Sequence, residues 1–441
     1  MKPNIVFLFP DQWRGDWIGK STREKSLRTP TLERLAEEGV SFTKAFTPSP
    51  LCAPARACIA TGKSYPAYGV FNNGQDLHSH ATTVYQKLHN KGYHVMGCGK
   101  FDLHKTSYTW GKDGKHLLKE WGFDDGIDNE GKQDGILSYK KGQVGPYLHF
   151  LEKRNKAQEH IADFEKRKGS GTFPTTLQDD EYCDNWICDN ALQLLDRAPQ
   201  DKPWFIQVNF AGPHIPFDVT QEMYRWHKNT TFPPPFGVNE NDVEINKRRQ
   251  NYADMIENID RNMQKILDHP RIHNDKENTI IIFASDHGDM LGDFGYWGKA
   301  KPYNGSSNVP LIFSGCTIPH GKCINTPVTI LDLPSTFLDV AGEKEACADS
   351  ISLLPTIKDE KPNRKFICSS LYVENNPAAM WRMIIKERYK YIIWDNAKEA
   401  LYSLDDYQEK DNLIQDKPEI ARQLHDEIEK NIPISSRPLK K

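Results

Sequence analysis

The chain has 441 residues and a formal net charge of −3, with 38% hydrophobic and 27% charged residues, a balance that is ordinary for a folded globular protein. This charge gives no reason to expect nucleic acid or an anionic membrane surface as a partner, because both attract strongly basic proteins. The length suits one large domain with a smaller one beside it.

The chain opens on a short apolar run at residues 5–9. This run is too short to cross a bilayer, and Pro10-Asp11-Gln12 follows it where a signal segment would have a small-residue cleavage site. As written, the sequence predicts a cytoplasmic protein. It predicts a periplasmic or secreted protein if a signal segment has been removed ahead of it.

Runs of β-branched and aromatic residues alternate with amphipathic helical stretches over most of the chain. The expected strands are residues 4–9, 93–97, 204–210, 279–284 and 310–313. The expected helices are residues 31–38, 82–90, 182–197, 253–267 and 331–341. Near-continuous apolar strands that alternate with helices predict an α/β fold with a mainly parallel central sheet flanked by helices.

Two stretches depart from this pattern. Residues 102–180 are rich in lysine, glycine and acidic residues, which predicts a variable excursion from the sheet with short helices such as 147–165. Near the C-terminus the expected elements are strands 365–372, 380–386 and 389–394, a polar turn region at 405–412 and a helix at 418–430. We therefore expect a main domain over residues 1–360 and a C-terminal subdomain over 361–441, with a small antiparallel sheet and one helix.

Polar side chains follow four of the expected strands, at the point where each strand ends. In chain order these residues are Asp11 and Gln12, Lys100 and His104, His214, and Asp286 and His287. In open α/β sheets ligands bind beyond the carboxyl ends of the strands, so these side chains are expected at one rim of the sheet.

Four of these residues offer donors that suit a hard divalent cation. Asp11, Gln12 and Asp286 carry carboxylate or amide oxygens, which Ca²⁺ and Mg²⁺ favour, and His287 adds an imidazole. Each pair also fits a plainer interpretation when taken alone. Residues 11–12 fit a strand-to-loop junction, and residues 285–289 fit a turn with a helix N-cap.

Cys52 lies just before a short expected helix at residues 55–60. The N-terminus of a helix attracts anions and stabilises negative charge, and Arg56 would lie one turn along near the same point. A lone cysteine is more often a small buried residue of the core, and Arg56 alone would suit a surface salt bridge.

Residues 51–62, Leu-Cys-Ala-Pro-Ala-Arg-Ala-Cys-Ile-Ala-Thr-Gly, resemble the signature of the sulfatase family in the alkaline phosphatase-like superfamily. The resemblance implies that a maturation enzyme oxidises Cys52 to formylglycine, whose hydrate is the nucleophile. It also implies an alkaline phosphatase-like α/β catalytic domain over residues 1–360 and a divalent cation, Ca²⁺ with Mg²⁺ or Mn²⁺ as alternatives. The implied metal ligands are Asp11, Gln12, Cys52 in its modified form, Asp286 and His287.

Other segments carry the same resemblance. They are residues 3–12, 99–101, 213–217, 285–292 and 297–299 with 309–310. The resemblance implies that Lys100 and Lys299 bind the sulfate oxygens, that His214 protonates the departing alcohol, and that Arg56 orients the nucleophile. Asn73 is a weaker candidate for a substrate contact, and a turn residue is an equal interpretation of it.

Two positions depart from the family pattern. Gln12 stands where many members have a second aspartate, although its amide oxygen still suits a hard cation. Asp102 stands where the family commonly has a histidine, two residues after Lys100. His104 is the candidate to take over that role and deprotonate the nucleophile.

These residues together predict a hydrolase of a sulfate monoester, either a small aryl sulfate or a sulfated carbohydrate. One alternative is a phosphonate or phosphate ester hydrolase of the same superfamily, which the sequence Asp11-Gln12-Trp13-Arg14 resembles. A less favoured alternative is a non-catalytic binding protein in which Cys52 stays unmodified.

Overall fold

The structure is a computed structural model that describes residues 2–19, 25–168, 170–238, 242–344, 346–359, 364–373 and 376–432. An eight-stranded sheet lies at its centre, in the order β10-β2-β9-β7-β1-β6-β4-β5. Its strands are β1 (Asn4–Leu8), β2 (Gly39–Phe42), β4 (His94–Gly99), β5 (Asp125–Asp128), β6 (Trp204–Asn209), β7 (Thr279–Ala284), β9 (Leu311–Gly315) and β10 (Lys322–Ile324). Among these described strands β9 alone runs against the others, so the expected mainly parallel sheet is confirmed.

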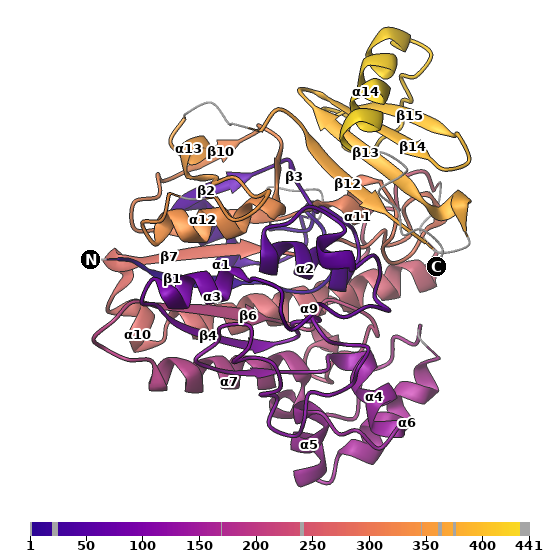
Figure 1. Cartoon of the computed structure of the whole chain (residues 1–441). Coiled ribbons are helices and arrows are strands. Elements are labelled where there is room, and N and C mark those ends of the chain that lie inside the picture. Colours follow the sequence, from indigo (N-terminus) through magenta and orange to yellow (C-terminus); the bar gives the residue numbers. More distant parts are fainter. Residues whose placement is uncertain are drawn as a thin grey trace.

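Helices cover both faces of the sheet (Figure 1). Alternate side chains of β1 explain why: Val6 and Leu8 join one apolar cluster, and Ile5 and Phe7 join the other. The first cluster includes residues of α1 (Pro30–Glu37), α7 (Cys183–Arg197) and α9 (Val243–Leu267). The second includes residues of α2 (Cys52–Thr61), α3 (Val84–Asn90) and α12 (Leu333–Val340).

Residues 102–180 were expected to leave the sheet, and this prediction is wrong for one strand. β5 pairs in parallel with β4 and forms the edge of the main sheet. It was missed because Asp125-Gly-Ile-Asp128 has one large apolar residue and alternates between buried and partly buried positions. The expected helix 147–165 is two helices, α5 (Pro146–Lys153) and α6 (Ala157–Arg167), separated by a turn with Asn155 at φ 59°.

The C-terminal sheet is antiparallel, as expected. Its order is β12 (Ile367–Leu371), β13 (Trp381–Lys386), β14 (Tyr389–Trp394) and β15 (Glu399–Ser403). α14 (Pro418–Asn431) packs on one face, where Leu424 and Ile428 meet Ile384. β15 was not predicted. The expected boundary at residues 360 and 361 lies outside the described residues and stays a prediction.

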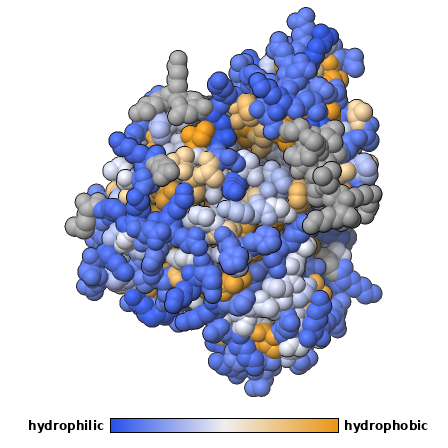
Figure 2. All heavy atoms as spheres, in the orientation of Figure 1, coloured by the Kyte–Doolittle hydropathy of each residue, from blue (hydrophilic) through white to orange (hydrophobic). Residues whose placement is uncertain are grey.

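The remaining elements are short. A three-stranded sheet has the order β11 (Val328–Thr329), β3 (Ala45–Phe46), β8 (Asn308–Val309). The other helices are α4 (Lys132–Lys140), α8 (Tyr224–His227), α10 (Pro270–His273), α11 (Asn304–Ser307) and α13 (Leu354–Ile357). No helix in the described part of the chain has the length and apolar character needed to span a bilayer. The face shown in Figure 2 is mainly hydrophilic, with scattered apolar side chains.

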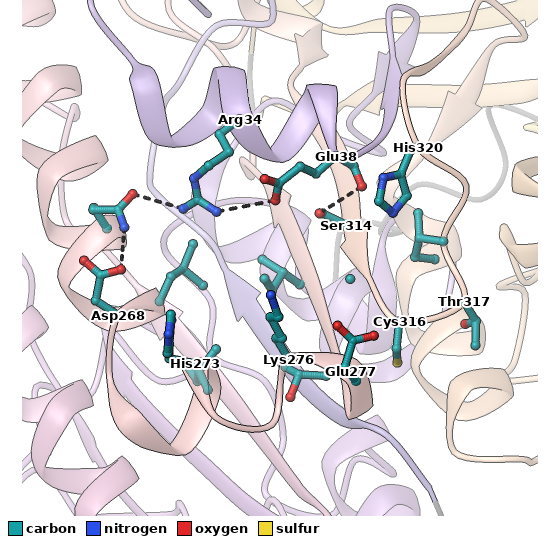
Figure 3. A pocket seen from close by; sticks show the side chains of 17 residues that line it. Arg34, Glu38, Asp268, His273, Lys276, Glu277, Ser314, Cys316, Thr317 and His320 are labelled. Atoms are coloured by element: carbon teal, nitrogen blue, oxygen red, sulfur yellow. Dashed lines mark hydrogen bonds and ion pairs between the residues drawn. The ribbon is translucent and has the colours of Figure 1, made fainter.

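A cavity of about 770 Å³ lies at the amino edge of the parallel strands. Its lining includes Leu267 at the end of α9 and Thr279 at the start of β7. Figure 3 shows that part of its charged lining is paired internally, since Arg34 contacts Glu38. Arg34 Nη2 also donates to Gln264 Oε1 at 3.0 Å. None of the residues proposed from the sequence for the site is among the described residues that line it. The reactive groups therefore lie elsewhere, at the opposite edge of the sheet.

Candidate active site

The carboxyl edge of the sheet gathers the polar residues that follow the strands. Asp11 lies three residues after β1, Lys100 directly follows β4, and Asp286 with His287 follow β7. The side chains of all four lie within contact distance of Cys52 or of one another. His214 follows β6 on a loop that pairs with the segment after β1 through a bridge between Asp11 and Pro213.

Cys52 is fully buried and is the first residue of α2, one turn earlier than the helix expected from the sequence. Its Sγ lies 2.7 Å from Lys299 Nζ, 3.3 Å from His287 Nε2 and 3.6 Å from Asp11 Oδ1. Lys100 Nζ lies 3.7 Å away. Four chain segments therefore converge on one sulfur atom at the amino end of a helix.

The charges around Cys52 favour an anion at this position. Burial and the Asp11 carboxylate raise the pKa of the Cys52 thiol, but Lys100, Lys299 and His287 outweigh them and lower it to about 5. Cys58 lies in the same helix, and there burial raises the pKa of the thiol to about 12. The difference between these two cysteines comes from the surrounding charges, because both thiols are buried.

Asp11, Cys52, Asp286 and His287 form a compact donor group, with one potential ligand atom from each within 4.8 Å of the others. The His287 ring donates from Nδ1 to the Gly288 carbonyl oxygen at 3.0 Å, which leaves Nε2 free to act as a ligand. Carboxylate oxygens with one imidazole suit a hard divalent cation.

Gln12 gives a separate test of whether a cation fits. Its Nε2 donates to Asp289 Oδ2 at 2.5 Å, so its Oε1 points the other way. That oxygen is buried and has no hydrogen-bond partner among the described residues. A buried polar atom is rarely left without a partner, so an ion fits the position. The residues present therefore fit the cation that the resemblance implies.

Arg56 was expected to orient the nucleophile, and its guanidinium contacts two carboxylates of the donor group and the backbone at Lys100. Its Nε donates to Asp286 Oδ2 at 3.0 Å, and its Nη2 lies 3.5 Å from Asp11 Oδ2. Its Nη1 donates to the Lys100 carbonyl oxygen at 2.6 Å. Arg56 therefore fixes the two carboxylates of the donor group and the segment that carries Lys100.

Lys100, Lys299 and His214 surround the same point. Lys100 Nζ forms an ion pair with Asp11 in addition to its contact with Cys52. His214 donates from Nδ1 to the Ile215 carbonyl oxygen at 2.6 Å, which leaves Nε2 as its free nitrogen. Burial and the charge of Lys299 lower the pKa of His214 well below its usual value. The arrival of an anion beside the lysines would offset their charge and raise that pKa.

His104 does not lie where the sequence-based hypothesis needs it. Its Nε2 is 2.9 Å from Asp128 Oδ2, and its ring packs against Trp110 and Trp121. Within the described residues no contact joins His104 to Cys52 or its neighbours. The expectation that His104 replaces the family histidine is therefore corrected: its imidazole contacts the buried Asp128 carboxylate beside aromatic rings.

Asp102, which stands at the position of the family histidine, forms ion pairs with two lysines. Asp102 Oδ2 lies 3.2 Å from Lys100 Nζ and 3.0 Å from Lys105 Nζ. Lys105 also contacts Asp134 at 3.0 Å and is largely buried. Sequence reasoning missed Lys105 because nothing in its spacing distinguishes it from a surface lysine. Asp102 has φ 56°, a left-handed turn conformation, and its carboxylate contacts Lys100.

Two further residues missed in the sequence hold the loops of the site. Asp184 Oδ1 in α7 accepts hydrogen bonds from the backbone N–H groups of Ala211, at 2.7 Å, and Gly212, at 3.0 Å. Asp289 Oδ1 accepts from the N–H of Gly298 at 2.9 Å, next to Lys299. Asp184 fixes the loop before His214, and Asp289 fixes both Gln12 and the loop before Lys299.

Asn73 lies beside the nucleophile position, but its observed contact is with the backbone. Its Oδ1 accepts a hydrogen bond from the Ala53 N–H at 3.0 Å, in the first turn of α2. An Asn side chain in this place satisfies one of the free N–H groups of the helix. Asn73 therefore helps to hold the helix that begins with Cys52.

Comparisons with known proteins identify the family of the chain. A profile described as Sulfatase matches residues 3–343. An arylsulfatase from Clostridium perfringens is 28% identical over 381 residues, which cover 77% of this chain and 75% of that protein. The chain spans most of that relative.

Two solved structures share the fold. The phosphonate monoester hydrolase of Agrobacterium radiobacter aligns with a TM-score of 0.78 at 21% identity, covering 97% of this chain and 94% of the other. A protein in complex with its substrate D-glucosamine-2-N,6-O-disulfate aligns with a TM-score of 0.78 at 19% identity, covering 99% of this chain and all of the other. At these identities the likeness concerns the fold alone.

Proposed function

The chain belongs to the sulfatase family of sulfuric ester hydrolases, and we propose that it hydrolyses a sulfate monoester of an aryl alcohol or a carbohydrate at residue 52. The cluster around Cys52 Sγ carries this proposal, with Lys299 Nζ at 2.7 Å and Lys100 Nζ at 3.7 Å. A sulfate ester is an anion that reacts at sulfur, so it needs positive charge and a nucleophile at one point.

The proposed nucleophile is formylglycine made from Cys52 by a maturation enzyme. When present, this group supplies a hydroxyl nucleophile with a second hydroxyl that allows the sulfate to be released, which a thiol does not offer. The contacts of Cys52 Sγ then stand for those of one hydroxyl oxygen. The buried position at the start of α2, beside two lysines, supports a group that carries negative charge during the reaction.

A divalent cation is the second proposed component, with Ca²⁺ preferred and Mg²⁺ or Mn²⁺ as alternatives. Asp11, Gln12, Asp286 and His287 would hold it together with residue 52, as the donor group and the free Gln12 oxygen support. When bound, it supplies Lewis-acid chemistry that lowers the pKa of the attacking hydroxyl and polarises the sulfate oxygens.

The other side chains bind charge and move a proton. Lys100 and Lys299 neutralise sulfate oxygens, and Arg56 holds Asp11 and Asp286 in place through the contacts described above. The free Nε2 of His214 donates a proton to the departing alcohol once the bound anion has raised its pKa. Asp102 keeps Lys100 charged through its ion pair, and Lys105 holds the Asp102 carboxylate through a second one.

A phosphonate or phosphate ester is the second candidate substrate. Gln12 favours the phosphate monoester, because a neutral amide in place of a second aspartate leaves the site less negative and better suited to its double charge. The fold shared with a phosphonate monoester hydrolase is compatible with either substrate class. A binding protein with unmodified Cys52 would keep the charges of the site and show no turnover.

Parallel assays with phenyl sulfate, phenyl phosphate and a phenylphosphonate monoester test the proposed function. Protein co-expressed with a maturation enzyme is expected to show its highest kcat/KM on the sulfate. A higher kcat/KM on either phosphorus ester would establish the second candidate. Binding of phenyl sulfate without turnover, with residue 52 still a cysteine despite the co-expressed maturation enzyme, would support the non-catalytic alternative.

Asp184 gives a prediction about the loop that carries His214. Asp184→Ala is expected to lower kcat/KM for an alkyl sulfate at least about tenfold more than for 4-nitrophenyl sulfate, because only a poor leaving group needs a well-placed proton donor. Asp184→Asn keeps an acceptor oxygen for the two N–H groups and should restore most of the loss. Equal losses on both esters would indicate a general effect on the fold, with no specific effect on His214.

A further inference from the structure

Arg248 in α9 is a cation that the mechanism above does not use. Its guanidinium carbon lies 4.7 Å from the centre of the Trp297 ring. Its Nε is buried without a hydrogen-bond partner, and no acidic side chain among the described residues forms an ion pair with it. A cation held on an indole face is stabilised in place while its outer N–H groups stay free for another ligand.

Trp297 connects Arg248 with two segments of the site, the one that carries Lys299 and the one that carries His214. It lies two residues before Lys299, whose Nζ contacts Cys52 Sγ. Its ring also packs on Phe217, with centroids 6.3 Å apart, three residues after His214. Arg248 therefore lies over the junction of the segments that carry the sulfate-binding lysine and the proton donor.

The geometry of α9 turns Arg248 toward the same site. Residues four apart share a helix face, and Tyr252, one turn later, donates from its hydroxyl to the Gln12 carbonyl oxygen at 2.7 Å. Asn251 donates to the Phe217 carbonyl oxygen at 2.7 Å. α9 ends beside the amino edge of the sheet, where Leu267 lines the cavity of Figure 3, so its earlier turns lie toward the carboxyl edge. Arg248 therefore lies one helical turn before Tyr252, on the side of α9 that faces the segment carrying Gln12.

We propose that Arg248 binds a second anionic group on the alcohol part of the substrate, a carboxylate or another sulfate, so that the preferred substrates are dianionic sulfate esters. This inference rests on the proposed function, because His214 marks the side on which the alcohol departs. The planar guanidinium suits either anion, since both accept two parallel N–H donors.

A series of small aryl sulfates tests the proposal. The series contains phenyl sulfate, its 3- and 4-carboxylates, and the 1,3- and 1,4-disulfates of the same ring. Wild-type protein is expected to show a KM at least about tenfold lower for a dianionic member than for phenyl sulfate. The carboxylates and the disulfates separate the two sources of the second charge, and the two ring positions cover different distances from the reacting sulfate.

Arg248→Met is expected to remove that preference, and Arg248→Lys to keep part of it because the charge remains without the planar fork. Lys247→Met is the matched control, because Lys247 is the neighbouring cation and pairs with Glu244 at 2.9 Å. It should keep the preference of wild-type protein. Thermal unfolding of each variant shows whether the fold is intact.

Binding of the same compounds to the Cys52→Ala variant, measured by calorimetry, makes the test independent of turnover. Suppose that wild-type protein releases sulfate from none of the compounds, but a dianion still binds about tenfold more tightly than phenyl sulfate and loses this advantage in Arg248→Met. The proposed function then fails and the anion site stands. If phenyl sulfate and all four dianions have equal KM and affinity, or if the preference survives in Arg248→Met, the inference is overturned.

Discussion

Cys52→Ala is expected to lower kcat/KM for phenyl sulfate by about 10⁵-fold, because it removes the group that becomes the nucleophile while leaving the binding charges in place. The measurement is sulfate release by the purified variant and by wild-type protein, both co-expressed with a maturation enzyme. Mass spectrometry of the peptide that contains residue 52 should show conversion of cysteine to formylglycine in the wild-type protein.

Cys58→Ala is the matched control for this variant. Cys58 lies in the same helix and is equally buried, but burial raises the pKa of its thiol and no lysine of the site contacts it among the described residues. Its activity should stay within a factor of a few of wild-type protein. Activity that survives in Cys52→Ala, or an unconverted cysteine in fully active protein, would refute formylglycine catalysis at this position.

Removal of the cation gives the second large effect. Treatment with a chelator is expected to lower kcat/KM for phenyl sulfate by at least about 10³-fold, because the two lysines cannot replace the Lewis acid at the nucleophile. Titration with Ca²⁺, Mg²⁺ and Mn²⁺ should restore activity and identify the preferred ion. Thermal unfolding measures cation binding independently of catalysis, because a ligand that binds only the folded state raises the unfolding temperature.

Gln12→Leu tests the same site through one residue. Leucine removes the unpartnered oxygen at similar volume, so the concentration of cation needed for half-maximal activity should rise at least about tenfold. Gln158→Leu, at an exposed position of α6, serves as the control and should need the wild-type concentration. An unchanged cation requirement in Gln12→Leu would exclude Gln12 as a ligand.

Much of the fold and of the donor group could be predicted because both follow from strong local patterns. Buried parallel strands are continuous apolar runs, and the polar residues just after them must meet at one edge. Asp11, Asp286 and His287 were found this way, and the structure brings them to Cys52. The edge strand β5 has no such run, because one of its neighbours is solvent, and it was therefore missed.

Other parts of the site depend on contacts that no local pattern shows. Asp184 lies in the first turn of α7, where an aspartate in the sequence suggests a solvated side chain near the helix N-terminus, yet its carboxylate is buried against the loop before His214. His104 and Lys105 are neighbours on a turn, and only their contacts in the fold show which of them faces the site. Sequence spacing favoured the histidine, whereas the structure pairs the lysine with Asp102 and turns the histidine toward Asp128.

The complete burial of Cys52 also sets an order of events during synthesis. Its partners His287 and Lys299 lie 235 and 247 residues further along the chain. At ordinary rates of translation that separation corresponds to a delay on the order of 10 to 50 s, during which the walls of the site have not yet been made. Under the proposed function, a maturation enzyme has this interval to reach an open thiol, and folding then closes it off. Slower synthesis or delayed folding would therefore increase the fraction of Cys52 that is converted to formylglycine. The yield of active protein then depends on the rate of oxidation relative to the rate of folding.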